Sequence, residues 1–269
     1  MGNFRYEELK SPEVGEASLH DPVVVLPVGT MEQHGPHMPL MVDYIIPQRI
    51  ANDVAVQMAP NVIVMPPVVY SFNEHHMDFP GTIAINMYTI IDYVAQIGFS
   101  LAHHGFRHIV LLNGHGSNVP VMDLAMRRIN NESAAISVLA NYWALIRAED
   151  LTWDRESHGV SHHADEDETS LMLYLYPHLV DMGKAVRTVE EVQQSEHIWG
   201  AWPANTRIHY QEFFSRNTST GIQGDPTGAS AEKGEVLYKA AVNRTAAFLE
   251  EFRAREIRPQ RDFHPGPQA

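Results

Sequence analysis

Two carboxylates and an imidazole lie close together near the N-terminal end of this 269-residue chain. Glu32, His34 and Asp43 follow one another within residues 27–43. Oxygen and nitrogen ligands of these kinds suit a hard or borderline divalent cation. The apolar run at residues 23–26 predicts a buried strand just before them, so the three side chains are expected where that strand ends. The pattern indicates a metal site and therefore a metal-assisted hydrolase.

A second histidine of interest, His115, also follows an apolar run, at residues 109–112. It lies in an Asn-Gly-His-Gly turn, where Gly114 and Gly116 allow backbone shapes that bulkier residues resist. Such a turn can also be only a tight connection. Most of the 16 histidines are expected to be surface groups or hydrogen-bonded core groups. The position of His115 after a strand makes it a candidate ligand.

A second acidic cluster, Asp165 to Glu168, begins a helix predicted over residues 166–176. Acidic residues at a helix start are favoured by the helix dipole, so most of them need no functional explanation. Glu168 differs because apolar residues follow it at +3, +4 and +7, on the same helix face. A carboxylate that points inward needs a partner, and a metal ion is a good one. Asp165 and Asp167 are expected to be solvated.

The candidate residues must be positioned by a regular alternation of strands and helices. Strands are predicted over residues 23–26, 62–65, 109–112 and 135–139, and helices over 44–58, 88–104, 121–130, 166–176 and 229–253. This alternation predicts an α/β fold, with a mostly parallel central sheet between two helical layers. Ligands of such sheets bind beyond the carboxyl ends of the strands, so the candidates are expected at one edge. Residues 1–269 are predicted to form one domain, with a frayed tail at about 258–269.

Composition limits the function classes. The net charge is −14 and no Lys/Arg cluster occurs, which argues against a nucleic-acid or anionic-membrane partner. The chain has no cysteine, so any metal must be held by His, Asp and Glu. No signal peptide and no apolar run of spanning length is present, which predicts a cytoplasmic protein.

Five segments together resemble the motifs of the creatininase family of metal-dependent amidohydrolases. They occur in the family's order between about residues 21 and 235. The segments are Glu32-Gln-His34-Gly-Pro-His37 with Asp43, Phe79-Pro-Gly-Thr82, Asn113-Gly-His115-Gly-Ser-Asn118, His163-Ala-Asp-Glu-Asp-Glu168-Thr-Ser, and Gly221-Ile-Gln-Gly-Asp-Pro226. The first motif is quite specific, and the combination is much stronger than any single piece.

The resemblance implies a centre of two divalent metal ions. By this resemblance Asp43 bridges both ions, Glu32 and His115 complete one position, and His34 belongs to the other. Zinc is expected first, with manganese or ferrous iron as alternatives, because all three suit these ligands. The family also implies a homo-oligomer, commonly a hexamer.

The chain departs from creatininase proper at Ser117. In creatininase a glutamate at this position supplies a metal ligand, so the serine argues against creatinine itself as the substrate. Glu168 could provide the missing ligand. The family's acid/base histidine corresponds to His163, whose ordinary pKa of about 6.5 would suit proton transfer to the leaving nitrogen. His76, at the family's Glu-His position, is expected to orient the substrate or the ligands.

A predicted aromatic contact completes the candidate site. Trp143 follows the last predicted strand and, with Tyr142, could stack on a flat heterocycle, although such a pair is more often plain core. Trp143 is therefore predicted, with His76, to bind substrate. The loops that select the substrate are predicted around residues 143–160 and 195–220.

The leading prediction is an amidohydrolase that cleaves a C–N bond of a small amide with a metal-activated water. A cyclic amide or a formamide is the expected substrate. The family offers two alternatives: a deformylase acting on a formamidopyrimidine nucleotide, and a peptidase that trims a precursor peptide. A non-catalytic metal- or ligand-binding protein is the alternative from another class.

Overall fold

The structure is a computed structural model, and it describes residues 4–153, 163–189 and 211–264. Its centre is a sheet of four parallel strands in the order β2-β1-β3-β4. The strands are β1 (Val23–Val28), β2 (Val62–Val64), β3 (His108–Asn113) and β4 (Ile136–Asn141). Every strand predicted from the sequence is present, and the expected parallel sheet is confirmed.

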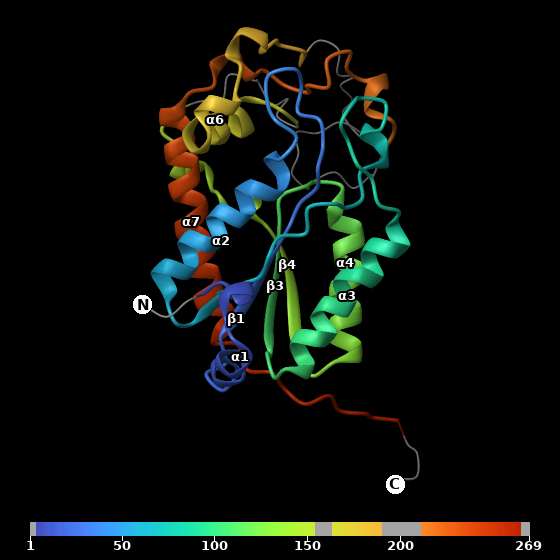
Figure 1. The fold of residues 1–269 in the computed structure, drawn as a ribbon, viewed down its shortest axis with the longest axis vertical. Helices are drawn as coiled ribbons and strands as arrows, with labels where there is room; N and C mark the ends of the chain where they lie inside the picture. The colour runs from blue at the N-terminus through green and yellow to red at the C-terminus, as the bar shows by residue number, and fades with distance from the viewer. Residues whose placement is uncertain (1–3, 154–162, 190–210, 265–269) are drawn as a thin grey trace.

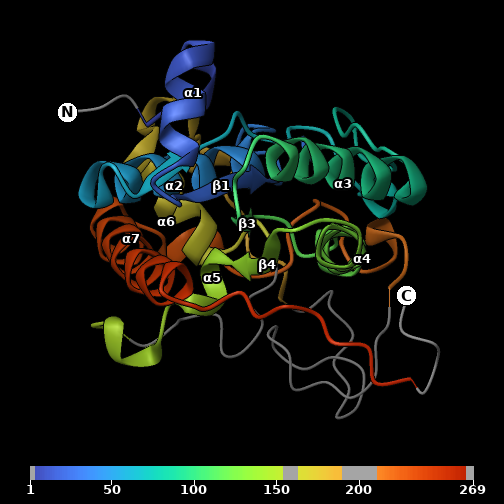
Figure 2. The ribbon, with the colours of Figure 1, turned by 90° about the horizontal axis from the view of Figure 1, so that it is seen from below.

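Helices cover both faces of the sheet, which confirms the predicted three-layer α/β fold. Figures 1 and 2 show α2 and α7 on one side of the strands and α3 and α4 on the other. The helices are α1 (Ser11–Ser18), α2 (Val42–Met58), α3 (Met87–His103), α4 (Asn118–Glu132), α5 (Tyr142–Leu145), α6 (Glu166–Leu175) and α7 (Ala231–Arg253). Only α1 and α5 have no predicted counterpart, because both are too short to show a clear helical period.

The two faces of the sheet build two hydrophobic clusters. In β1, Val23 and Val25 pack with α2 and α7, whereas Val24 and Leu26 pack with α3 and α4. Because both faces are covered, the strand is apolar at every position instead of alternating. Each of these buried side chains contributes about 1.5–3 kcal/mol relative to an exposed one. This core holds the carboxyl ends of the strands in fixed positions.

The start of α6 differs from the expectation. Asp165 is buried rather than solvated, because its carboxylate caps the helix and accepts hydrogen bonds from the main-chain nitrogens of Asp167 (3.0 Å) and Glu168 (3.1 Å). A carboxylate at this position satisfies donors that the helix itself leaves unpaired. The cap fixes the direction in which the first turn of α6 presents Glu168.

At the C-terminal end, residues 258–264 belong to no helix or strand, and the rest of the predicted tail lies outside the described residues. Parts of the two predicted substrate-selecting loops, 154–160 and 195–210, also lie outside them. Within the described part of the chain, no helix combines the length and the apolar composition needed to cross a bilayer.

Candidate metal centre

Asp43 lies between two imidazoles at the carboxyl edge of the sheet. Its Oδ1 is 3.1 Å from Nε2 of His34, and its Oδ2 is 3.0 Å from Nδ1 of His115. All three side chains are buried. Asp43 comes from the first turn of α2, His34 from the loop after β1, and His115 from the loop after β3. The structure thus brings together three ligand candidates from three segments.

Two glycines hold the first turn of α2 in this place. A Cβ atom at Gly29, after β1, would lie 2.3 Å from the main-chain oxygen of Asp43, and one at Gly114, after β3, would lie 2.0 Å from it. Any larger residue would push the helix away from the strand ends. The two glycines therefore set the distance between Asp43 and His115.

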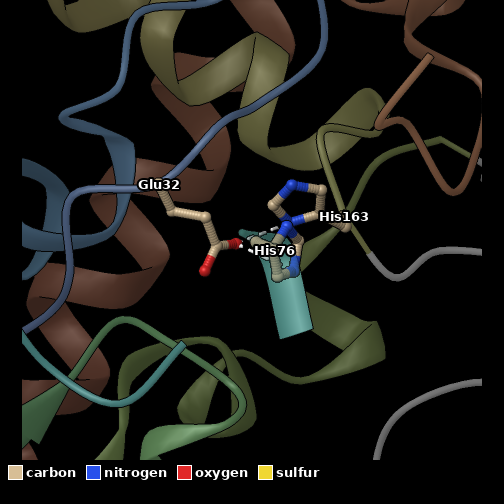
Figure 3. A group of neighbouring side chains, drawn as sticks. All are labelled: Glu32, His76 and His163. Carbon is tan, nitrogen blue, oxygen red and sulfur yellow. Dashed lines mark ion pairs between the residues drawn. The ribbon is translucent and has the colours of Figure 1, made fainter. Parts of the chain in front are cut away.

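Glu32 has no exposed surface, and its carboxylate faces histidines, two of which, His76 and His163, are drawn in Figure 3. Its carboxylate oxygens lie 3.2 Å from Nε2 of His76, 3.4 Å from Nε2 of His115 and 3.5 Å from Nδ1 of His163. His76 lies in the short 3-10 helix η2 (Glu74–His76), and His163 lies just before α6. One carboxylate therefore links loops that follow β1, β2 and β3 with the start of α6.

Glu168 points inward, as its helical spacing predicted. Its Oε2 lies 3.7 Å from Nε2 of His34 and accepts a hydrogen bond of 2.7 Å from the main-chain nitrogen of Ala164. Ala164 has a φ of 53°, in the left-handed region that a residue with a Cβ rarely adopts. This strained residue turns the chain between His163 and α6, so that both His163 and Glu168 face the same cluster.

Main-chain carbonyls fix the orientation of two of the imidazoles. Nδ1 of His34 donates to the carbonyl of Glu32 (3.1 Å), which leaves the lone pair on Nε2, beside Asp43. Nε2 of His163 donates to the carbonyl of Gln33 (2.8 Å), which leaves the lone pair on Nδ1, beside Glu32. Histidine ligands of metal ions are commonly oriented in this way, by a second hydrogen bond to an oxygen.

Two of the three carboxylates of the cluster, Glu32 and Glu168, favour the protonated form in the absence of a cation. Burial raises the pKa of Glu32 to about 7 and that of Glu168 to about 8. Burial alone would also raise the pKa of Asp43, but His34 and His115 outweigh it and lower that pKa. For His34, burial acts to lower the pKa, and Asp43 raises it to about 10. A divalent cation would replace the protons that these groups otherwise require.

His163 and His76 behave differently. Burial, followed by the charge of His34, places the pKa of His163 well below the ordinary value. The pKa of His76 is also well below it, because of burial and then His163. The ordinary pKa expected for His163 from the sequence is therefore wrong, because its ring is removed from water. The lowered pKa of His163 favours the uncharged ring.

The donor set fits divalent metal ions. Nε2 of His34, Oδ2 of Asp43 and Nε2 of His115 are buried and make no hydrogen bond of good geometry within the described part of the chain. Several groups of ligand atoms lie within 4.8 Å of one another: Glu32 with His34 and Asp43, Glu32 with His75 and His115, Glu32 with His76 and His163, and His34 with His163 and Glu168. Buried polar atoms without partners are costly, and coordination to a cation would satisfy them.

The last predicted site residue, Trp143, lies in α5. Its indole packs against the hydrophobic cluster on the α2 and α7 side, with the ring of Tyr142 edge-on at 5.4 Å between centroids. Its Nε1 is buried and has no hydrogen-bond partner among the described residues. A contact between Trp143 and substrate stays a prediction.

Gln33 and Phe214 are among the site residues that were missed from the sequence. The Phe214 ring stacks on His76 at 4.0 Å and meets His163 edge-on at 5.0 Å, so it forms an apolar wall of the cluster. The Gln33 amide donates to Nδ1 of His76 (2.9 Å) and to the carbonyl of Gly221 (3.0 Å). Gln33 could have been noticed between two ligand candidates, but Phe214 has no local signal because its contacts are distant in sequence.

Comparisons with known proteins match this chain to one family. The Creatininase family model, described as creatinine amidohydrolase, matches residues 7–249. Creatinine amidohydrolase of Pseudomonas putida is 33% identical, over 94% of this chain and 96% of that protein. Mycofactocin precursor peptide peptidase of Mycolicibacterium smegmatis is 31% identical, over 84% and 83%. The chain therefore belongs to the creatininase family.

Solved structures give the same result. A structure described as creatininase Mn superimposes with a TM-score of 0.76 at 31% identity, over 93% of this chain and 99% of that one. A creatininase variant of the Zn-Zn type superimposes with a TM-score of 0.77 at 30% identity, over 94% and 99%. These relatives contain manganese or zinc, which suits the kind of donor set seen here.

Proposed function

We propose that this protein is a dinuclear metal-dependent amidohydrolase that cleaves a C–N bond of a small amide, with a cyclic amide or a formamide as the substrate class. The buried cluster of three carboxylates and their facing imidazoles carries this proposal. Such a cluster is expensive to bury unless cations neutralise it. Membership of a family that includes a creatinine amidohydrolase supports the reaction class.

The ligands divide between two positions that share Asp43. Glu32 and His115 would hold one ion with it, and His34 and Glu168 would hold the other. Asp43 contacts Nε2 of His34 (3.1 Å) and Nδ1 of His115 (3.0 Å), so it lies beside one ligand candidate of each position. Glu32 faces the other ring nitrogen of His115 at 3.4 Å, so the His115 ring must turn for both carboxylates to reach one ion with it. Glu168 supplies the carboxylate that Ser117 does not.

When bound, divalent ions supply an activated water and stabilise negative charge on the carbonyl oxygen. The chain itself must manage the proton. His163 is neutral, has its lone pair on Nδ1, and lies beside Glu32. It can accept a proton and then transfer it to the departing nitrogen, which is a very poor leaving group without one. His76 and Phe214 hold His163 in position from the other side.

The test is hydrolysis of a panel of small cyclic amides and formamides by zinc-loaded and manganese-loaded protein. His163→Gln keeps its metals but loses the proton carrier, so turnover should fall by about 100- to 10,000-fold. Phe4→Leu, at a residue that pairs with the end of β2 and packs against the hydrophobic core, serves as the control. Full metal content with no turnover of any amide, or a His163→Gln rate near wild type, would contradict the proposal.

A precursor-peptide peptidase is the second candidate. It is favoured by the 31% identity to the mycofactocin precursor peptide peptidase and by Ser117, which separates this chain from creatininase. The same cluster could cleave a peptide amide, because the chemistry at the carbonyl is the same. Adding short peptides to the panel distinguishes the two candidates by the substrate with the higher kcat/KM.

A further inference from the structure

His75 lies beside the cluster and has no role in the proposed function. It belongs to η2, next to His76, and its ring stacks on the ring of His115 with centroids 5.9 Å apart. Its Nε2 lies 3.0 Å from Oγ of Ser117. His75 is partly exposed, whereas His34, His76, His115 and His163 are all buried. It is therefore the least buried histidine of this group.

The geometry places His75 within reach of an ion held by Glu32 and His115. One ligand atom from each of these three residues lies within 4.8 Å of the other two. Metal–nitrogen and metal–oxygen bonds of zinc are about 2.0–2.2 Å long, so two ligand atoms of a tetrahedral site lie about 3.4 Å apart. The three ligand atoms must therefore approach one another by up to about 1.4 Å to hold an ion.

Ser117 contacts one ring nitrogen of His75, Nε2, at 3.0 Å. When Nε2 of His75 donates to the serine hydroxyl, the lone pair of the imidazole is on Nδ1 and is available to an ion. An oxygen that accepts from the second ring nitrogen is the usual outer partner of a histidine ligand. Ser117 would then be a positioning residue for His75 and not itself a ligand.

We propose that His75 is a metal ligand that joins Glu32, Asp43 and His115 at one position of the centre, an inference that rests on the proposed dinuclear site. That position then has four protein ligands and is closed. The other position, with His34, Asp43 and Glu168, has three and keeps a place for water or substrate. The same distinction separates structural from catalytic zinc sites. The two ions therefore differ in affinity and in role.

The experiment compares zinc affinities by titration of the metal-free protein against a chelating dye. Wild type binds two zinc ions, one more tightly than the other. His75→Ala weakens the tighter position by more than 100-fold and leaves the other nearly unchanged. Ser117→Ala weakens the tighter position by roughly 10–100-fold, as loss of an outer partner does. His20→Ala, an exposed histidine far from the cluster, serves as the control.

Two further measurements separate ligation from packing. His75→Gln keeps much of the side-chain volume and a donor for Ser117, and it should still lose the tight site, with a shifted visible spectrum of the cobalt-substituted protein. If His75→Ala and His75→Gln both kept the wild-type zinc affinity and cobalt spectrum, the proposed role of His75 would be overturned. Equal weakening of both positions would also overturn it, because that result indicates a structural role. If the wild-type protein binds no zinc, the proposed function is refuted, and the ligand role of His75 is refuted with it.

Discussion

Gly114→Ala tests how the fold positions the cluster, because the added methyl group meets backbone that cannot easily move. The new Cβ would lie 2.0 Å from the main-chain oxygen of Asp43 and 2.8 Å from Cγ of Pro47. Ordinary contact begins near 3.4 Å. The first turn of α2 must therefore retreat by about 1.4 Å, a distance that follows from normal van der Waals separation. Asp43 moves with it, away from His115.

This displacement has a cost for stability and one for activity. Overpacking of a tight core contact destabilises by about 1–3 kcal/mol. For a chain of this size each kcal/mol lowers Tm by about 2–4 °C, so a decrease of about 2–12 °C is expected. A misplacement of about 1 Å in a reacting site can reduce the rate by about 100-fold. Zinc affinity should fall as well, because Asp43 is the ligand shared by both positions.

The assay is a thermal melt with and without zinc, together with a zinc titration of the folded protein. Gly15→Ala is the matched control, since a Cβ there meets nothing within 4 Å and lies in an exposed part of α1. Alanine in a helix should stabilise that control slightly, by at most about 1 kcal/mol. If Gly114→Ala retained the wild-type Tm and zinc affinity, the reasoning about the strand-end glycines would be refuted.

Two further predictions concern residues around the cluster. Burial and then the charge of His34 lower the pKa of His37 to about 4, and its Nε2 contacts Oγ1 of Thr169 at 2.9 Å. Unfolded His37 binds a proton below about pH 6.5 and the folded form does not until about pH 4, so stability falls as the pH decreases through this window, by up to about 3 kcal/mol. In urea unfolding of the metal-free protein, His37→Gln should lose less stability than wild type between about pH 6.5 and about pH 4. The same pH dependence in both proteins would contradict the lowered pKa of His37. Phe214→Ala should lower the free energy of unfolding by about 3 kcal/mol, and it should lower kcat because the apolar wall behind His163 is removed. Phe214→Leu should retain most of the stability and most of kcat. Unchanged kcat in Phe214→Ala would show that the wall has no part in turnover.

Most of the fold could be predicted because both faces of the sheet are covered. Burial on two sides makes β1 and β3 continuous apolar runs, which stand out in a sequence of otherwise mixed polarity. The ligand candidates could be found for a related reason. Glu32, His34 and His115 follow those runs directly, and parallel strands bring their carboxyl ends to one edge.

Other features of the site depend on contacts that sequence spacing does not contain. The expected exposure of Asp165 was wrong, because its carboxylate caps α6. The expected pKa of His163 was wrong, because burial by distant residues such as Phe214 determines it. The single domain, the oligomer and the cytoplasmic location stay predictions, and so do the catalytic and ligand roles themselves.

The central claim is that two metal ions share Asp43 inside this cluster. Diffraction from crystals grown with zinc, measured at the zinc absorption edge, tests it most directly. The account predicts two anomalous peaks, one among Glu32, Asp43 and His115 and the other among His34, Asp43 and Glu168. A single peak, peaks elsewhere on the molecule, or none at all would contradict it.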